Sequence, residues 1–159
     1  MKIRILAIGK IKEKYLKDGI EEYLLRIRPY SQIEIVEVND EPILDNPNES
    51  EIKKAIDLEG KKILKIIKPS DYLIGLDLNK KEYTSEEFAS YVNKKFVAGG
   101  SSISFVIGGS YGLSDELKER CNDSISLSKM TFLHQMTRLI LLEQIYRAFK
   151  INRNETYHK

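Results

Sequence analysis

Cysteine and histidine are scarce in this 159-residue sequence, which contains Cys121 as its single cysteine and His134 and His158 as its two histidines. One thiol cannot build a disulfide framework, and this usage is typical of proteins that fold in a reducing, intracellular compartment. The paired Cys and His spacings of zinc sites are missing as well. We therefore expect a cytoplasmic protein that needs no disulfide bonds and holds no metal ion.

The sequence also lacks a long, uninterrupted hydrophobic run. Its opening segment from Met1 to Ile8 is apolar except where Lys2 and Arg4 break it. Such a segment is too short and too interrupted for a signal peptide or a membrane-spanning helix. It is typical of a buried β-strand, and we expect no membrane partner.

The glycine motifs of the common nucleotide-binding folds are missing too. Gly108-Gly109-Ser110 does not complete the G-x-G-x-x-G dinucleotide fingerprint, and no Gly-Lys-Ser/Thr of a P-loop follows it. Ser110 also lacks the G-x-S-x-G context of a hydrolase nucleophile. These absences argue against an α/β nucleotide hydrolase or reductase, the alternative enzyme class. A Ser-His-Asp triad stays open, although no acidic partner stands out.

Charge of both signs is present, but it is unevenly placed. The formal net charge of +2 divides into +5 over residues 1–17, −7 over residues 18–127 and +4 over residues 128–159. Basic ends around an acidic middle indicate that the two ends share a face that meets an anion such as nucleic acid. Ordinary solvated lysines are an equally acceptable interpretation of the charge alone.

Strand-like and helix-like hydrophobic spacings alternate along the whole chain. This alternation predicts an α/β fold with a mostly parallel sheet and helices on both faces. No repeat or long linker divides the chain, so we expect one domain over residues 1–159. The predicted strands are 2–8, 33–38, 72–78, 102–107 and 123–128, and the predicted helices are 13–27, 49–67, 85–97, a short one capped by Ser114, and 133–150.

The segments between these elements carry turn and cap residues. Asn48 with Glu51, and Thr84 with Glu87, resemble helix capping boxes. Residues 79–81 are expected to turn, Gly99-Gly100 to break the chain, and residues 39–48 to form a mobile loop.

Three loops leave the ends of predicted strands in the second half of the chain, at residues 76–78, 108–110 and 127–132. Ligands of open parallel sheets bind beyond the carboxyl ends of the strands. The paired glycines of the second loop let a ligand approach the backbone, although such a pair is more often just a tight turn. Together the loops predict an apolar slot lined by backbone groups and suited to an adenine ring.

The C-terminal region has two further features. Apolar residues cover much of the circumference of the last helix, which indicates either a second partner surface such as a homodimer contact, or deep burial in the chain's own core. The tail then places Arg153, Tyr157 and His158 close together. Histidine moves protons near neutral pH, whereas a solvated tail is the ordinary interpretation of a chain end.

Several segments, taken in order, resemble the ribosomal RNA large-subunit methyltransferase H family of the SPOUT class. They are Met1-Lys2-Ile3 with Gly9-Lys10, residues 105–112, residues 126–132, His134-Gln135-Met136 with Arg138, residues 143–148, and Tyr157-His158-Lys159. The resemblance implies a deep trefoil knot in the C-terminal half and S-adenosylmethionine bound in a bent shape. It also implies a homodimer with cofactor sites at its interface. The implied reaction is methylation of N3 of a pseudouridine in a large-subunit (23S) rRNA stem-loop within the assembled ribosome.

The resemblance also assigns residues to roles. Cofactor contacts fall on Leu76, Gly108, Leu127, Ser128, Lys129, Met130, Thr131 and Phe132. Candidates for assisting loss of the N3 proton are His158, Tyr157 and Arg153 in the tail, and His134 and Arg138 in the last helix. Lys10, Lys12, Lys14 and Arg147 are expected to bind RNA phosphates.

The chain departs from the family pattern at a few positions. Leu133 stands where many members have proline, and Asn154 and Thr156 stand where glycine and proline are common. The change to Asn154 is mild, because asparagine tolerates left-handed backbone better than most residues. A catalytically silent RNA-binding or ribosome-assembly factor is the non-enzymatic alternative.

Overall fold

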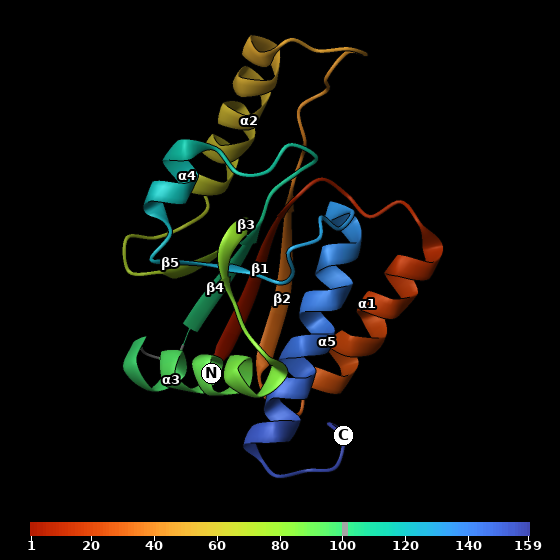
Figure 1. Cartoon of the computed structure of the whole chain (residues 1–159), viewed down its shortest axis with the longest axis vertical. Helices are drawn as coiled ribbons and strands as arrows, with labels where there is room; N and C mark the ends of the chain where they lie inside the picture. The colour runs from red at the N-terminus through yellow and green to blue at the C-terminus, as the bar shows by residue number, and fades with distance from the viewer. Residues whose placement is uncertain (100–101) are drawn as a thin grey trace.

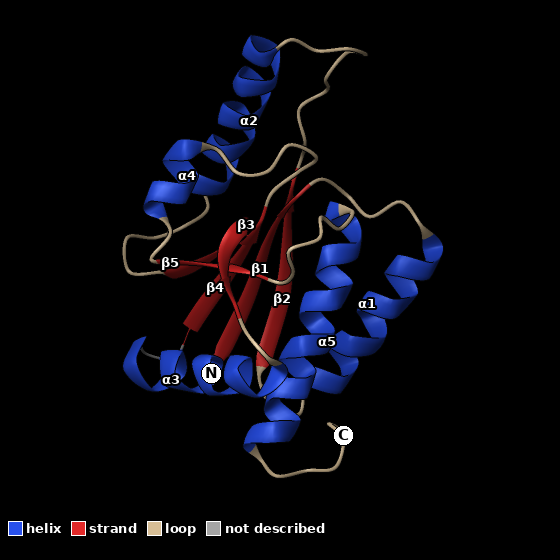
Figure 2. Ribbon diagram, viewed as in Figure 1, coloured by secondary structure: helices blue, strands red, loops and turns tan. Residues whose placement is uncertain are grey.

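Five parallel strands form one sheet, in the order β2-β1-β4-β3-β5. The structure is a computed structural model that describes residues 1–99 and 102–159 (Figures 1 and 2). The strands are β1 (Lys2–Ile8), β2 (Gln32–Val38), β3 (Tyr72–Glu82), β4 (Ser102–Ile107) and β5 (Asp123–Ser126). Because all strand pairs are parallel, their carboxyl ends meet along one edge, as the predicted α/β class requires.

Helices cover both faces of this sheet, which confirms the predicted layering. The helices are α1 (Lys14–Ile27), α2 (Glu49–Leu64), α3 (Ser85–Gly99), α4 (Asp115–Arg120) and α5 (His134–Asn152). Helix α5 packs between α1 and α3 on one face, and α2 packs with α4 on the other (Figure 1). No helix within residues 1–99 and 102–159 is long and apolar enough to cross a membrane.

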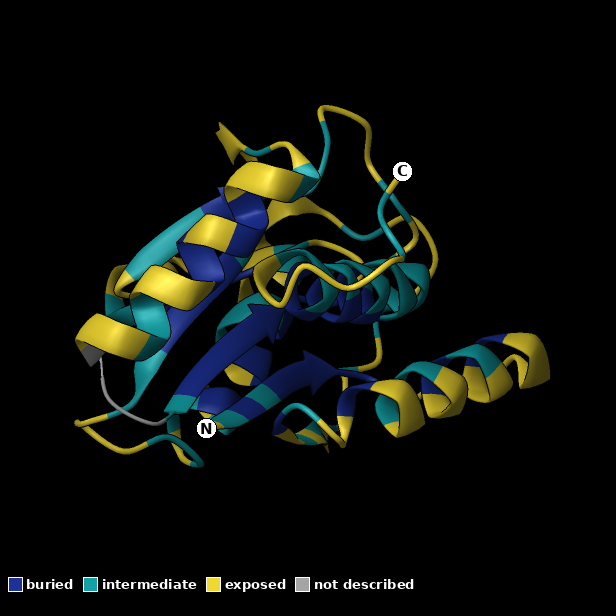
Figure 3. Cartoon of the chain, turned by 90° about the horizontal axis from the view of Figure 1, so that it is seen from below, coloured by how far each residue is buried: buried dark blue, intermediate teal, exposed yellow. Residues whose placement is uncertain are grey.

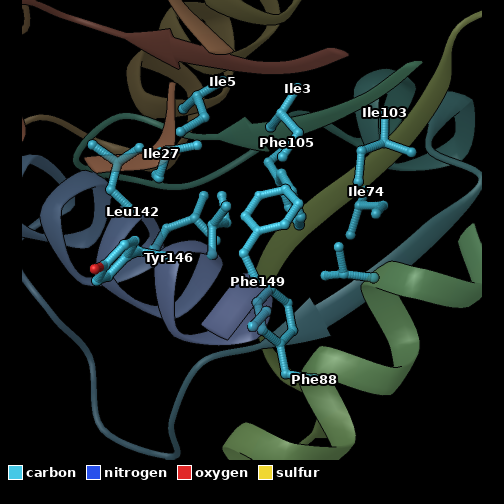
Figure 4. Close-up of a cluster of buried hydrophobic side chains, with 14 of the residues drawn as sticks. Ile3, Ile5, Ile27, Ile74, Phe88, Ile103, Phe105, Leu142, Tyr146 and Phe149 are labelled. Carbon is cyan, nitrogen blue, oxygen red and sulfur yellow. The ribbon is translucent and has the colours of Figure 1, made fainter. Parts of the chain in front are cut away.

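The strands bury side chains on both faces, so two hydrophobic clusters form. In β1, Ile3 and Ile5 point into the larger cluster, whereas Leu6 and Ile8 point into the smaller one under α2 and α4. This alternation follows from the two-residue period of a strand. Phe105 of β4 is fully buried at the centre of the larger cluster (Figure 4), and the sheet lies in dark blue between the half-exposed helices in Figure 3.

Side-chain caps explain where several helices begin. The backbone N–H of Glu87 donates to Thr84 Oγ1 over 3.1 Å, and the backbone N–H of Thr84 donates to a Glu87 carboxylate oxygen over 2.8 Å. Asn48 accepts from the Glu51 backbone N–H over 2.8 Å. These bonds satisfy amides that the first helical turn leaves free, and they confirm both predicted capping residues.

The predicted turn at residues 79–81 is wrong, because β3 continues through it to Glu82. Asn79 adopts a φ of 59°, and the pairing register with β5 shifts between Leu76 and Lys81. Ser126 holds this irregularity by donating to Asp77 O over 2.6 Å and accepting from Lys80 N–H over 2.8 Å. A residue on the neighbouring strand β5, 46 positions further along the chain, therefore converts an expected turn into an extension of β3.

Smaller differences concern the ends of elements. Helix α2 ends at Leu64 rather than near residue 67, β5 ends at Ser126 rather than at residue 128, and α5 continues to Asn152. The expected break at Gly99-Gly100 includes Gly100, which lies outside the described residues.

The last helix is apolar because it is the central helix of its face. Leu141, Leu142 and Ile145 are fully buried in the larger cluster between α1, α3 and the sheet. Burial in its own core therefore accounts for much of the wide apolar surface of α5.

Candidate cofactor and active site

A cavity of about 490 Å³ opens at the carboxyl edge of the sheet, where the chain leaves β3, β4 and β5. Its lining comes from residues 76–78, 107–113, 127–128 and 130–134, together with Lys118 and Thr137. We call this cavity the slot. The three loops that the sequence analysis selected therefore lie together, in an arrangement consistent with the knot that the resemblance implies.

The middle loop of the slot is folded tightly on itself. A Cβ atom on Gly108 would lie 2.5 Å from the carbonyl carbon of Gly112, so a side chain has no room there. Gly112 has a φ of +88° and donates its N–H to Gly109 O over 3.1 Å. Glycine is needed at position 108 for space and at position 112 for conformation. The loop thus presents backbone rather than side chains to the slot.

The remaining walls are largely apolar. Seven of the eight expected cofactor residues line the slot: Leu76, Gly108, Leu127, Ser128, Met130, Thr131 and Phe132. Lys129 is the exception, because it is not among the lining residues. Ser128 accepts from the backbone N–H of Met130 over 3.0 Å and so shapes the third loop. Such walls with a few backbone donors and acceptors fit a flat heteroaromatic ring.

His134, the first residue of α5, borders the slot and also a second cavity beside it. Burial lowers the pKa of His134 below its ordinary value of 6.5, and the nearby positive charge of Arg138 acts in the same direction. The imidazole is therefore held neutral at physiological pH, in a form that can accept a proton.

Arg138, one turn further along α5, does not reach the slot. Its side chain is only 1% exposed, and it forms an ion pair with Glu37 of β2. One of its terminal nitrogens donates to the carbonyl oxygens of Gly9, over 2.7 Å, and Ile8, over 3.2 Å. The structure thus places this candidate catalytic residue in buried polar contacts that connect α5 to the ends of β1 and β2. Arg138 is not among the residues that line the slot.

The tail is anchored at the opposite end of α5 from the slot (Figure 1). Tyr157 donates its hydroxyl to Glu143 over 3.1 Å. His158 lies 3.1 Å from an Arg147 nitrogen through Nδ1. The guanidinium of Arg153 stacks 4.8 Å from the ring centroid of Tyr30. Tyr157 and His158 thus fold back onto Glu143 and Arg147 of α5, and none of residues 153–159 is among those that line the slot of their own chain.

Tyr157 is the most perturbed titratable group of the tail. Burial, together with its contacts to Tyr23 and Glu143, raises the pKa of its phenol well above the ordinary value of 10.0. The phenol therefore stays protonated and acts as a hydrogen-bond donor rather than as a base.

The sequence analysis missed Glu59 of α2, which is only 5% exposed and lies beside Gly109. Its spacing gave a usable indication: Ala55, Glu59 and Ile63 follow one another at four-residue intervals on the buried face of α2. A carboxylate in an otherwise apolar helical stripe is a candidate for a special role. Tyr111 and Thr137, which also line the slot, carried no such sequence indication.

Comparisons with known proteins agree with this geometry. Residues 1–158 match the family described as "Predicted SPOUT methyltransferase". Proteins named ribosomal RNA large subunit methyltransferase H share 52% identity over 159 residues in Carboxydothermus hydrogenoformans and 47% over 161 residues in Symbiobacterium thermophilum, and in each case all of both chains is covered. These matches confirm the resemblance that the sequence motifs predict.

A solved structure has a similar fold. The methyltransferase structure Lpg2936 from Legionella pneumophila, in complex with the bound cofactor SAM, aligns with a TM-score of 0.50 and 13% identity. The alignment covers 94% of this chain and 66% of that one. The chain therefore belongs to the SPOUT methyltransferase family and, within it, to the ribosomal RNA large subunit methyltransferase H family.

Proposed function

We propose that this methyltransferase transfers a methyl group from S-adenosylmethionine to N3 of a pseudouridine in large-subunit rRNA, on the assembled ribosome in the cytoplasm. It works as a homodimer of single-domain chains spanning residues 1–159. The observation that carries this proposal is the slot, in which the loops after β3, β4 and β5 meet. Relatives with about half of their residues identical carry names that state the rRNA activity.

The residues of the slot fit S-adenosylmethionine. The backbone of residues 108–112 forms one side of the slot, and Leu76, Leu127 and Phe132 supply apolar walls against which a ring can lie. When bound, the cofactor supplies an electrophilic methyl group on a sulfonium. The chain's own contribution is to hold the reacting groups in line. Orientation of this kind can lower the activation barrier by several kcal/mol, up to a limit of about 7–11 kcal/mol.

A second copy of the chain completes the site in this proposal. Met130 and Leu133 at the rim of the slot are 74% and 54% exposed, and Tyr111 and Leu78 are exposed beside them. Exposed apolar side chains gathered around a binding site are typical of a surface that a partner covers. The second chain brings its own tail, since no residue of the tail lines the slot of its own chain.

The tail then faces the target base with Arg153, Tyr157 and His158. The N3 proton of the pyrimidine must leave before or during methyl transfer, so a base or a cation near N3 lowers the barrier. In this scheme His158 accepts that proton through Nδ1, which must first leave its contact with Arg147. The protonated Tyr157 and the guanidinium of Arg153 stabilise the negative charge that develops on the ring.

The test is methyl transfer from labelled S-adenosylmethionine to purified ribosomes that lack the modification, compared with free large-subunit RNA. We expect label on ribosomes, mapped to N3 of a pseudouridine, and little or none on free RNA. The matched control is the Gly108→Ala variant, whose added methyl group would clash with the Gly112 backbone and which should therefore lose cofactor binding. Absence of label despite tight cofactor binding would favour a catalytically silent ribosome-binding factor instead.

A further inference from the structure

A second cavity, also of about 490 Å³, adjoins the slot. The segment of residues 40–47 forms one side of it, in orange beside α2 in Figure 1, and Glu59 lies within it. The two cavities share residues 109–111 and His134 in their linings. A ligand in the second cavity therefore lies against the same loop and the same histidine as a cofactor in the slot.

Glu59 presents an unused hydrogen-bond acceptor to this second cavity. One carboxylate oxygen, Oε2, accepts from the backbone N–H of Glu41 over 3.0 Å. The other, Oε1, has no hydrogen-bond partner among residues 1–99 and 102–159, and a Cβ atom built on Gly109 would lie 3.4 Å from it. This oxygen is open to the second cavity, so it is free to accept a hydrogen bond from a donor on a ligand.

The other titratable groups around the second cavity are placed differently. Glu41 pairs with Lys62 over 2.7 Å, and Asp40 and Asp45 are exposed at its mouth. Burial raises the pKa of Glu59 above its ordinary value of 4.5. Glu59 is therefore the one buried carboxylate among the described residues that line this cavity, and it has no cation paired to it.

The surroundings indicate what enters. Negative charge at the mouth disfavours a phosphate in the cavity, and the free oxygen of Glu59 favours a group that carries an N–H donor. The basic loop with Lys10 and Lys12 lies alongside, because β1 and β2 are paired to their ends and Gly9 N–H donates to Val38 O over 2.8 Å. Exposed lysines therefore lie next to a cavity that contains the Glu59 acceptor. This arrangement suits a nucleotide whose phosphates contact Lys10 and Lys12 outside the cavity while its base enters it.

We propose that the second cavity seats the target base and that Glu59 selects pseudouridine over uridine by accepting the hydrogen bond of its N1–H. This inference rests on the proposed function. In pseudouridine the ribose is attached to carbon, so N1 carries a proton; in uridine N1 carries the ribose and has no proton to donate. An acceptor that meets only one of the two bases discriminates between them, because the other leaves it unpaired.

The test compares ribosomes that carry pseudouridine at the target position with ribosomes from cells that lack the pseudouridine synthase and therefore carry uridine. We expect the parent enzyme to methylate the pseudouridine ribosomes at least about tenfold faster, which corresponds to one hydrogen bond to a charged group. In Glu59→Gln the amide oxygen takes the bond from Glu41 N–H and the NH2 group faces the second cavity. An acceptor thus becomes a donor.

The variant should lose this preference, because its rate with pseudouridine falls far more than its rate with uridine. Asp57→Asn, on the same helix but paired with Lys53 at 2.7 Å, is the charge-matched control and should keep the preference. The inference is overturned if Glu59→Gln slows both substrates equally, or if the parent enzyme does not distinguish them. Failure of the parent enzyme on pseudouridine ribosomes is a different result and overturns the proposed function.

Discussion

The imidazole Nε2 of His158 lies 2.7 Å from a carboxylate oxygen of Glu86, so the end of the chain is bound to the first turn of α3. On its other side, Nδ1 meets Arg147 of α5. Most chain ends are poorly ordered unless they are tied down. Here two elements and an aromatic contact between Tyr157 and Tyr146 hold the tail in one place.

Deletion of residues 153–159 should reduce methyl transfer about 100-fold or more, the contribution typical of a proton-transfer group. Cofactor affinity should change little, because in the proposed dimer the tail meets the target base and none of its residues lines the slot of its own chain. The measurement is turnover on ribosomes together with calorimetric binding of S-adenosylmethionine. Sedimentation of the deleted chain checks that the dimer persists.

Mixed dimers test whether the tail serves the partner's slot. Each of two chains, one with Gly108→Ala and one without its tail, should be inactive alone. Dimers formed from both carry one intact slot facing the tail of the other chain, so activity should return. If mixing restores nothing although mixed dimers form, the tail acts within its own chain or has no catalytic role.

Arg138 should prove important for stability rather than for catalysis. Replacement by methionine removes the donor to the carbonyl oxygens of Ile8 and Gly9 and leaves Glu37 unpaired. We expect a loss of about 3 kcal/mol in the free energy of unfolding, measured in urea. The matched variant Arg138→Lys keeps the charge and should lose less. A stable Arg138→Met protein with normal cofactor binding and no turnover would restore Arg138 as a catalytic candidate.

The sequence predicted those parts of the fold that depend on local chemistry. The capping residues Asn48 and Thr84 lie at helix starts, because a cap bonds to amides only three residues away. The turn at 79–81 failed, because Ser126 on another strand decides how the backbone runs there. A bond between residues so distant in the chain leaves no local pattern.

The sequence predicted which loops form the candidate site, but it did not predict where every candidate side chain lies. Topology alone brings the strand-end loops together, since parallel strands end at one edge, and Gly108 and Phe132 duly share the slot. The position of Arg138 was not predictable, because an arginine one turn into an amphipathic helix can face solvent, ligand or core. Its burial depends on Glu37 of β2, which the sequence places 101 residues away.

Two glycines of the slot should respond differently to alanine. A Cβ on Gly108 meets backbone atoms of Gly112 at 2.5 to 2.9 Å, which cannot move away, so Gly108→Ala should lose about 2–3 kcal/mol of stability and cofactor binding with it. A Cβ on Gly112 meets nothing within 4 Å, and only its φ of +88° is unfavourable. Gly112→Ala should lose about 1 kcal/mol and keep measurable binding. Equal effects in urea unfolding and in calorimetry would contradict this account of the loop.

His134 should make the fold less stable in mild acid. Its pKa is lower in the folded chain than the ordinary 6.5, first because of burial and second because of Arg138. The unfolded chain therefore binds a proton more readily, and stability falls as pH drops below about 6.5, until the folded pKa is reached. His134→Gln removes the group that takes up this proton. The free energy of unfolding of the variant should therefore decline less between about pH 7.5 and pH 5.5. Parallel curves for both proteins would show that His134 is not held neutral by the fold.

The basic loop after β1 should determine how ribosome binding responds to salt. Lys10 and Lys12 are exposed next to the second cavity, and each phosphate contact contributes about 0.7–0.9 to the slope of log K against log salt concentration. Replacing both by glutamine should flatten that slope by about 1.4–1.8 and weaken binding at low salt. Turnover at saturating ribosome should be retained, because phosphate contacts position the RNA without touching the reacting base. Lys53→Gln with Lys54→Gln removes the same charge from the exposed face of α2 and should leave the slope unchanged. If both pairs flatten the slope equally, general charge rather than the β1 loop governs docking.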